Sequence, residues 1–269
     1  MKKLATALVS AAAIMTMSTT AFAAENPAEV FDRVMEKNNT IQSAEIQSGV
    51  HSVILAKDVI PDGQMKVDMA MHAEMDMQDT TDLKYLAQVA SSILGQDSYS
   101  QVFYTDGYYY VDANGVKLKY PMPLEQIISS VQTGVNTSNM ESSYMKGISL
   151  NEVNGKRVLA YEANPKKLNK NVKEALGTVM NTLGTDVNLD MNIQEMKGAY
   201  VLDDNDYIIY MTNYIVYNME VLAQPMTCIT LMETEVQNPG EPVVVTLPST
   251  DGYEDLIGLY DGVIESEVE

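Results

Sequence analysis

The sequence is poor in the residues that most catalytic and metal sites use. It has one cysteine and two histidines in 269 residues. A single cysteine, Cys228, excludes an internal disulfide, a zinc site built from cysteines and a thioredoxin-type motif. Two histidines leave little for acid–base or metal chemistry, and no hydrolase, metalloprotease, nucleotide-loop or dinucleotide motif is present. We therefore predict a protein that is not an enzyme, with no catalytic residues, no metal and no cofactor.

Basic residues are also scarce. Lys and Arg number 17 against 37 Asp and Glu, which gives a formal net charge of −20. A nucleic acid needs a basic footprint on its partner, so nucleic acid is excluded as a partner. The same charge repels anionic lipid headgroups, so any contact with lipid would have to be apolar.

Long apolar runs are missing outside the N-terminus. Residues 1–24 combine Lys2 and Lys3, a short apolar stretch and small residues up to Ala23, which is typical of a secretory signal peptide. No later segment approaches about 18 uninterrupted apolar residues, and no cysteine near the cleavage site could carry a lipid anchor. We predict an extracytoplasmic or secreted protein without a stable membrane anchor, with a single domain over 25–250 and an acidic tail over 251–269.

The apolar pattern predicts an α+β fold, in which helices pack against long antiparallel strands. Helical spacing predicts helices over 27–37, 83–94, 123–135 and 168–183. Period-two alternation, together with Asp-Gly and Asn-Gly turns, predicts strands over 46–56, 65–77, 101–104, 108–111, 116–120, 148–153, 156–162, 187–193, 200–202, 207–222, 226–236 and 243–247.

One strand carries a stripe of methionines. Apolar residues at every odd position from Met65 to Met77 alternate with polar residues such as Lys66 and Asp76. This pattern predicts an inward apolar face and an outward polar face. The stripe could be ordinary core, or it could be the wall of a cavity, because methionine is unbranched and adapts to varied apolar shapes.

Four other features have simpler explanations than a functional site. His51 and His72 lie among carboxylates, where a solvated polar face is a simpler interpretation than a metal site. The run Asp203–Asp206 lacks the glycine and the distal Glu of a calcium loop, so we predict a turn.

Cys228 lies in an apolar run and is predicted to be a buried thiol. The segment Asp106–Tyr120 is similar to one unit of choline- and wall-binding repeats, but it occurs once and lacks tryptophan.

Three segments resemble the lipoprotein-carrier superfamily. They are the tyrosine-rich run Phe103–Asp112, the strand Tyr207–Tyr210, and the segment Asn238–Val243 that precedes Leu247 and Pro248. That superfamily includes LolA, LolB, the RseB regulator, LppX and LprG, and this chain resembles its secreted Gram-positive relatives. The resemblance implies a curved antiparallel sheet forming an incomplete barrel, with helices on its concave face and an apolar cavity between them.

We therefore predict a binding protein that holds an apolar small molecule or lipid between sheet and helices. The alternative is a closed scaffold of the same fold that contacts other cell-envelope proteins in a structural or regulatory role. The predicted ligand-binding residues are Met65, Val67, Met69, Met71, Met75, Met77, Leu86, Val89, Ile93, Ile127, Leu189 and Met191.

Overall fold

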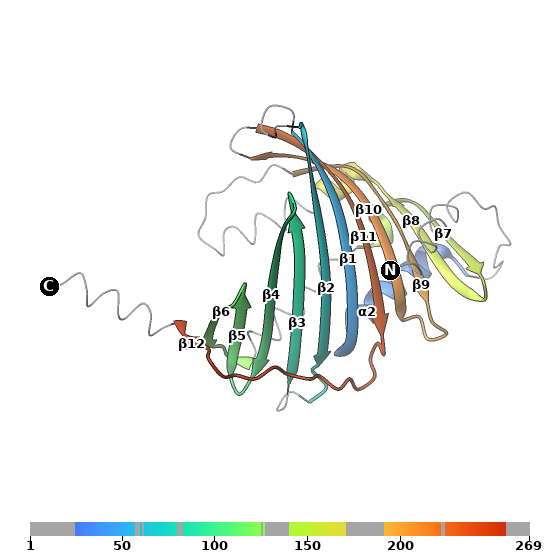
Figure 1. The fold of residues 1–269 in the computed structure, drawn as a ribbon. Coiled ribbons are helices and arrows are strands. Elements are labelled where there is room, and N and C mark those ends of the chain that lie inside the picture. The colour runs from blue at the N-terminus through green and yellow to red at the C-terminus, as the bar shows by residue number, and fades with distance from the viewer. Residues whose placement is uncertain are drawn as a thin grey trace. The chain divides into compact units, whose positions relative to one another are not determined.

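The computed structural model describes residues 25–56, 60, 62–79, 83–124, 126, 140–170, 191–221 and 224–256 (Figure 1). Most of these residues belong to β-strands. The elements are α2 (Pro27–Asn38), β1 (Ser43–Leu55), β2 (Gln64–Asp76), β3 (Lys84–Ile93), β4 (Gln96–Thr105), β5 (Tyr108–Ala113), β6 (Val116–Pro121), the 3-10 turn η2 (Ser142–Tyr144), β7 (Met145–Val153), β8 (Lys156–Ala163), β9 (Met191–Leu202), β10 (Ile208–Val221), β11 (Gln224–Gln237) and β12 (Glu254–Asp255).

Hydrogen bonds connect the strands in the order β12-β6-β5-β4-β3-β2-β1-β11-β10-β9-β8-β7. The order has two ends, so the sheet is open. The chain divides into two compact units. The first contains the described residues of Met1–Asn38, Val50–Asp68 and Met140–Glu235, and the second those of Asn39–Gly49, Met69–Asn139 and Val236–Glu269. Strand pairs within each unit are antiparallel, except that β12 runs parallel to β6.

Helix α2 begins at a well-defined N-terminal cap. The Asn26 side-chain oxygen accepts a hydrogen bond from the Ala28 N–H at 3.1 Å, and its amide donates to Glu29 at 3.1 Å. Pro27 occupies the first helical position, where its missing N–H has no cost. The helix predicted over 27–37 is confirmed.

Four hairpins turn through residue pairs with positive φ. The predicted turns Asp106-Gly107, Asn114-Gly115 and Asn154-Gly155 are confirmed, and Leu94-Gly95 is a fourth. Such pairs form the two-residue turns that match the twist of the flanking strands.

The helix predicted over 83–94 is wrong, because this segment forms β3. Its Leu, Ala and Gln residues favour a helix locally, but β3 pairs with β4 from Tyr85 opposite Tyr104 to Ile93 opposite Gln96. Burial on both faces of this pairing outweighs the local preference. Of the other two predicted helices, only 123, 124, 126 and 168–170 lie within the described residues, where 124, 126 and 165–170 are helical.

The core of the first unit lies between α2 and the strands. Val30, Phe31, Val34 and Met35 of α2 are buried. The Phe31 ring meets Tyr161 edge-on with centroids 5.8 Å apart. The strands contribute other buried residues to this α2 cluster, among them Leu150, Leu159, Ile193, Tyr200, Leu202 and Ile208.

The second unit has a core on each face of its strands. On one face Met75 and Met77 pack with Ala44, Leu83, Tyr104 and Val236. On the other face Leu86, Phe103 and Tyr110 pack with Val245 and Tyr253 of the C-terminal segment. The strand predicted over 243–247 is therefore wrong, because this segment pairs with no strand and instead covers the sheet with alternate side chains.

Candidate functional site

The register of β9, β10 and β11 places three methionines in one row. Met219 of β10 lies directly opposite Met226 of β11 on one side and Met191 of β9 on the other. Residues that are directly opposite in a sheet share a face, and their side chains touch. Figure 1 shows these three strands side by side in the first unit. The row therefore presents three neighbouring thioethers on one face.

The same face continues along the three strands. Positions two residues apart point to the same side, so Met211, Ile215 and Tyr217 of β10 share this face with Cys228, Thr230 and Met232 of β11. On β9, Met196 lies opposite Ile215. The positions on this face include no charged residue; they are 191, 193, 196, 198 and 200 of β9, the odd-numbered positions 211–219 of β10 and the even-numbered positions 226–234 of β11.

β1 and β2 extend this face within the first unit. The hydroxyls of Ser52 and Thr230 lie 2.9 Å apart, which places Ser52 on the face. On the other side of the same two strands, His51 Nδ1 lies 2.7 Å from the Asp68 carboxylate. Side chains alternate between the two sides of a strand, and Asp68 points away from this face. Met65, three residues earlier, therefore points toward the face.

We call this surface of the first unit the methionine face. Its methionines share one property, which is that each is half-buried rather than enclosed. They are Met65, Met191, Met196, Met211, Met219, Met226 and Met232. Met196 and Met211 also pack against the α2 cluster. The face is thus an apolar surface that adjoins a closed core and stays partly accessible.

The polar groups on the methionine face are neutral. Cys228 is buried, with its Sγ 3.7 Å from the Met219 Sδ, which confirms the predicted buried thiol. Burial raises the pKa of the Cys228 thiol, and burial followed by contact with Cys228 raises the pKa of the Tyr217 phenol. Both groups therefore stay protonated near neutral pH. This chemistry suits an uncharged, largely apolar ligand.

The methionine stripe of β2 changes from buried to exposed along the strand. Met75 and Met77 are buried in the core of the second unit, whereas Met71 is half-buried and Met69 is 38% exposed. Val67, in the first unit, is half-buried like Met65. The predicted strand is confirmed. Its methionines include both core residues and partly accessible residues.

The polar side of β2 is more covered than expected. Lys66 and Asp68 are exposed, but His72, Glu74 and Asp76 are half-buried. Glu74 is covered by the C-terminal segment, whose Thr246 N–H donates to the Glu74 carboxylate at 3.1 Å. The other Glu74 oxygen lies 3.1 Å from His72 Nε2. The described residues bring together no group of three or more His, Cys, Asp or Glu that could hold a metal.

The remaining predicted site residues are not brought together. Leu86, Val89 and Ile93 were expected on one helical stripe, but on β3 the even-numbered Leu86 faces the opposite side from Val89 and Ile93. Leu86 is buried beneath the C-terminal segment, Val89 is half-buried and Ile93 is 42% exposed. Ile127 and Leu189 lie outside the described residues.

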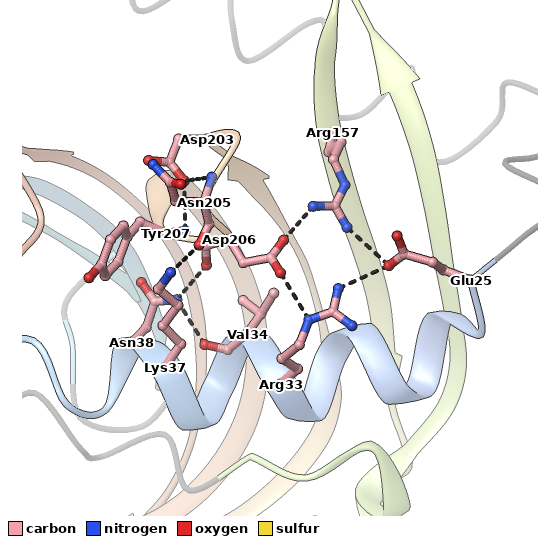
Figure 2. Close-up of polar contacts among 10 residues, drawn as sticks. All are labelled: Glu25, Arg33, Val34, Lys37, Asn38, Arg157, Asp203, Asn205, Asp206 and Tyr207. Atoms are coloured by element: carbon pink, nitrogen blue, oxygen red, sulfur yellow. Dashed lines mark hydrogen bonds and ion pairs between the residues drawn. The ribbon is translucent and has the colours of Figure 1, made fainter.

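The turn between β9 and β10 anchors α2 through ion pairs (Figure 2). Asp203 accepts hydrogen bonds from the N–H groups of Asn205 and Tyr207, both at 2.8 Å, so the predicted turn is confirmed. Arg33 of α2 and Arg157 of β8 both bind the Asp206 carboxylate, and both also reach Glu25. Burial opposes ionisation of Asp206, but the hydrogen bonds from Arg33 and Arg157 outweigh it and lower the pKa of Asp206. These four charged side chains are structural.

Residues 26–248 match a family described as a family of unknown function, DUF6612, and the chain belongs to this family. No curated protein matches the sequence.

Several solved structures are similar to the chain. LprF from Mycobacterium bovis is 10% identical, with a TM-score of 0.36 over 83% of this chain and 97% of LprF. The Mycobacterium tuberculosis lipoprotein LppX is 9% identical, with a TM-score of 0.34 over 82% of this chain and all of LppX. A β-barrel-like DUF1849 protein from Brucella abortus is 10% identical, with a TM-score of 0.25 over 74% of this chain and all of that one.

In the part of the chain that the structure describes, no helix has the length and apolar character that a membrane span requires.

Sequence reasoning missed most of the methionine face. It selected Met65 and Met191, but not the other five methionines. The signal was available only in part, because the segments 207–222 and 226–236 are apolar at both odd and even positions. The sequence of these segments therefore does not show which set of positions shares a face with the methionines of β9. The register with β9 decides this.

Proposed function

We propose that the protein is an extracytoplasmic, non-enzymatic binding protein that holds an apolar ligand, a lipid or an acyl chain, against the methionine face. The observation that carries this proposal is the set of half-buried methionines on a face without charged residues. Each unbranched thioether side chain can change rotamer to follow a flexible acyl chain.

The energetics favour an occupant of this kind. Each Å² of apolar surface that a ligand removes from water contributes about 25 cal/mol to the free energy of binding. The α2 cluster shows that the same strands can enclose their apolar side chains fully where a helix covers them. An apolar ligand would give the methionine face the cover that α2 gives the core.

The wider architecture follows from the predicted fold. In this proposal the sheet is an incomplete barrel, with helices packed on its concave face. The segment 1–24 would direct export, and no lipid anchor is expected in the mature protein. The alternative function is a closed scaffold that contacts other envelope proteins, and the close packing of the α2 cluster favours it as the second candidate.

A pair of tryptophan substitutions separates the two functions. Met232→Trp adds bulk on the methionine face, where the carrier function reserves space for ligand. Met35→Trp adds the same bulk inside the α2 cluster, where Met35 is 5% exposed. We expect Met232→Trp to weaken binding of a fluorescent fatty acid with little change in melting temperature. Met35→Trp should overpack the core at a cost of about 1–3 kcal/mol and leave binding by the folded fraction intact.

The scaffold function makes the opposite forecast. The parent protein would bind no fluorescent fatty acid, and Met232→Trp would lower the melting temperature as much as Met35→Trp does. That result would reject the carrier function.

A further inference from the structure

Four sulfur-containing residues are neighbours at one end of the methionine face. Met191, Met219 and Met226 form the row across β9, β10 and β11, and Cys228 shares the face two residues from Met226. The Cys228 Sγ lies 3.7 Å from the Met219 Sδ. Holding an acyl chain does not require a thiol at this place, so the proposed function leaves the cluster unexplained.

The spacing of the two sulfurs fits a shared metal ion. Metal–sulfur bonds are about 2.3 Å long, so two sulfurs on one three-coordinate ion lie about 4 Å apart. The Cys228 thiol donates a hydrogen bond to the Met219 sulfur at 3.7 Å, so the two sulfurs already lie near the separation that a shared ion requires. Met219 and Met226 are direct neighbours across the strand pair, so a third sulfur lies within reach through rotation of a flexible side chain.

The ligand chemistry selects the metal. Thiolate and thioether sulfurs are soft ligands that prefer Cu(I) over Mg²⁺, Ca²⁺ or Mn²⁺. One thiolate with neutral thioethers carries a single negative charge, which a monovalent ion neutralises. A divalent ion would leave a positive charge on a face without charged residues, and that is costly. The overall charge of −20 attracts a cation rather than opposing it.

We propose that Cys228, Met219 and Met226 form a binding site for Cu(I), with Met191 as an adjoining fourth sulfur. On binding, the Cys228 thiol releases its proton to solvent and Cu(I) takes its place, with no change in oxidation state. The site lies on the methionine face, but Cu(I) coordination needs only these side chains and no bound lipid.

The test is an anaerobic titration of the purified protein with Cu(I) against the chromogenic chelator bicinchoninate. We expect one Cu(I) per chain and X-ray absorption from a shell of sulfur atoms only. Loss of even an outer partner of a metal ligand costs about 10–100-fold in metal affinity. Met219→Leu, Met226→Leu and Cys228→Ala should therefore each weaken Cu(I) binding at least about tenfold.

Met232→Leu is the matched control, because it removes a thioether from the same strand and face without touching the cluster. It should bind Cu(I) as the parent does. Leucine is apolar and of similar volume, so Met219→Leu should also keep the parent melting temperature. Loss of Cu(I) binding with an unchanged melting temperature would thus reflect the missing sulfur and not a loss of folding.

Two results would overturn the site. One is a parent protein that takes no Cu(I) from the chelator, and the other is Met219→Leu and Met226→Leu variants that keep the parent affinity. Ag(I), which is soft and redox-inert, gives a second titration with the same expected order of variants. Silver binding that is equal in all variants would contradict the site as well.

Discussion

The α2 cluster and the methionine face belong to the same strands but are packed in different ways. In the α2 cluster, Phe31 and Val34 have no exposed surface, and branched or aromatic side chains interlock. On the methionine face the methionines are half-buried and unbranched. Branched and aromatic residues specify one packing, whereas methionine tolerates many. One unit therefore combines a rigid core with an adaptable apolar surface.

Truncation should give the largest contrast between these two regions. Phe31→Ala removes a fully buried ring and leaves a cavity, so we expect a loss of about 3–5 kcal/mol in the free energy of unfolding. Met232→Ala removes a side chain that is already partly in contact with water, so we expect a loss of about 1 kcal/mol. Urea denaturation of both variants measures the difference. Equal losses would mean that the methionine face is ordinary core.

A substitution at Gly198 tests how closely the α2 cluster and the methionine face pack where they meet. A Cβ at Gly198 would lie 2.5 Å from both the Asn213 Oδ1 and the Thr212 carbonyl oxygen, and 2.8 Å from the Tyr161 hydroxyl. Tyr161 belongs to the α2 cluster and donates a hydrogen bond to Asn213, which lies on the methionine face. We expect Gly198→Ala to cost about 1–3 kcal/mol, because the backbone oxygen cannot move aside cheaply.

Gly147→Ala is the matched control, since a Cβ there meets nothing within 4 Å. Its free energy of unfolding should stay near that of the parent. If Gly198→Ala were equally neutral in urea denaturation, the close packing at this boundary would be wrong.

Asp206 makes the stability of the α2 side depend on pH. Its folded pKa is lowered from the ordinary value of 3.8. Its contribution is therefore fully present above that value and disappears as pH falls through the lower folded pKa. Asp206→Asn should lose about 1–3 kcal/mol at neutral pH. Thermal unfolding from pH 7 to pH 3 should show a smaller decrease in this variant than in the parent, and parallel curves would contradict the role of the ion pairs.

The smallest expected effect concerns salt. The methionine face has no charged residues, so binding of a fatty-acid probe should change little between low and physiological ionic strength. Fluorescence titration at the two salt concentrations checks this. A steep loss of affinity with salt would instead indicate a charged binding site.

Local signals in the sequence were enough to predict α2, β1, β2 and the Asp-Gly and Asn-Gly turns. Each of these depends on residues that are close in the chain, such as the cap of α2 or the alternation from Met65 to Met77. β3 could not be predicted in this way, because its pairing with β4 decides its conformation against a helical local pattern.

The methionine face depends still more on distant residues. The row of Met191, Met219 and Met226 exists only through the register of three strands. The burial of Tyr253 likewise depends on the C-terminal segment returning to Phe103 and Tyr110, which no local pattern indicates. Sequence periodicity therefore identified many of the strands, but not the surface that they form together.

Native mass spectrometry of the protein purified from a bacterial host tests the central claim most directly. A protein that holds an apolar ligand on the methionine face should carry co-purified lipid, seen as a mass above that of the polypeptide and removed by organic extraction. The Met232→Trp variant should carry less of it than Met35→Trp. A parent protein with the mass of the polypeptide alone, which also fails to take up added fatty acid, would contradict the account.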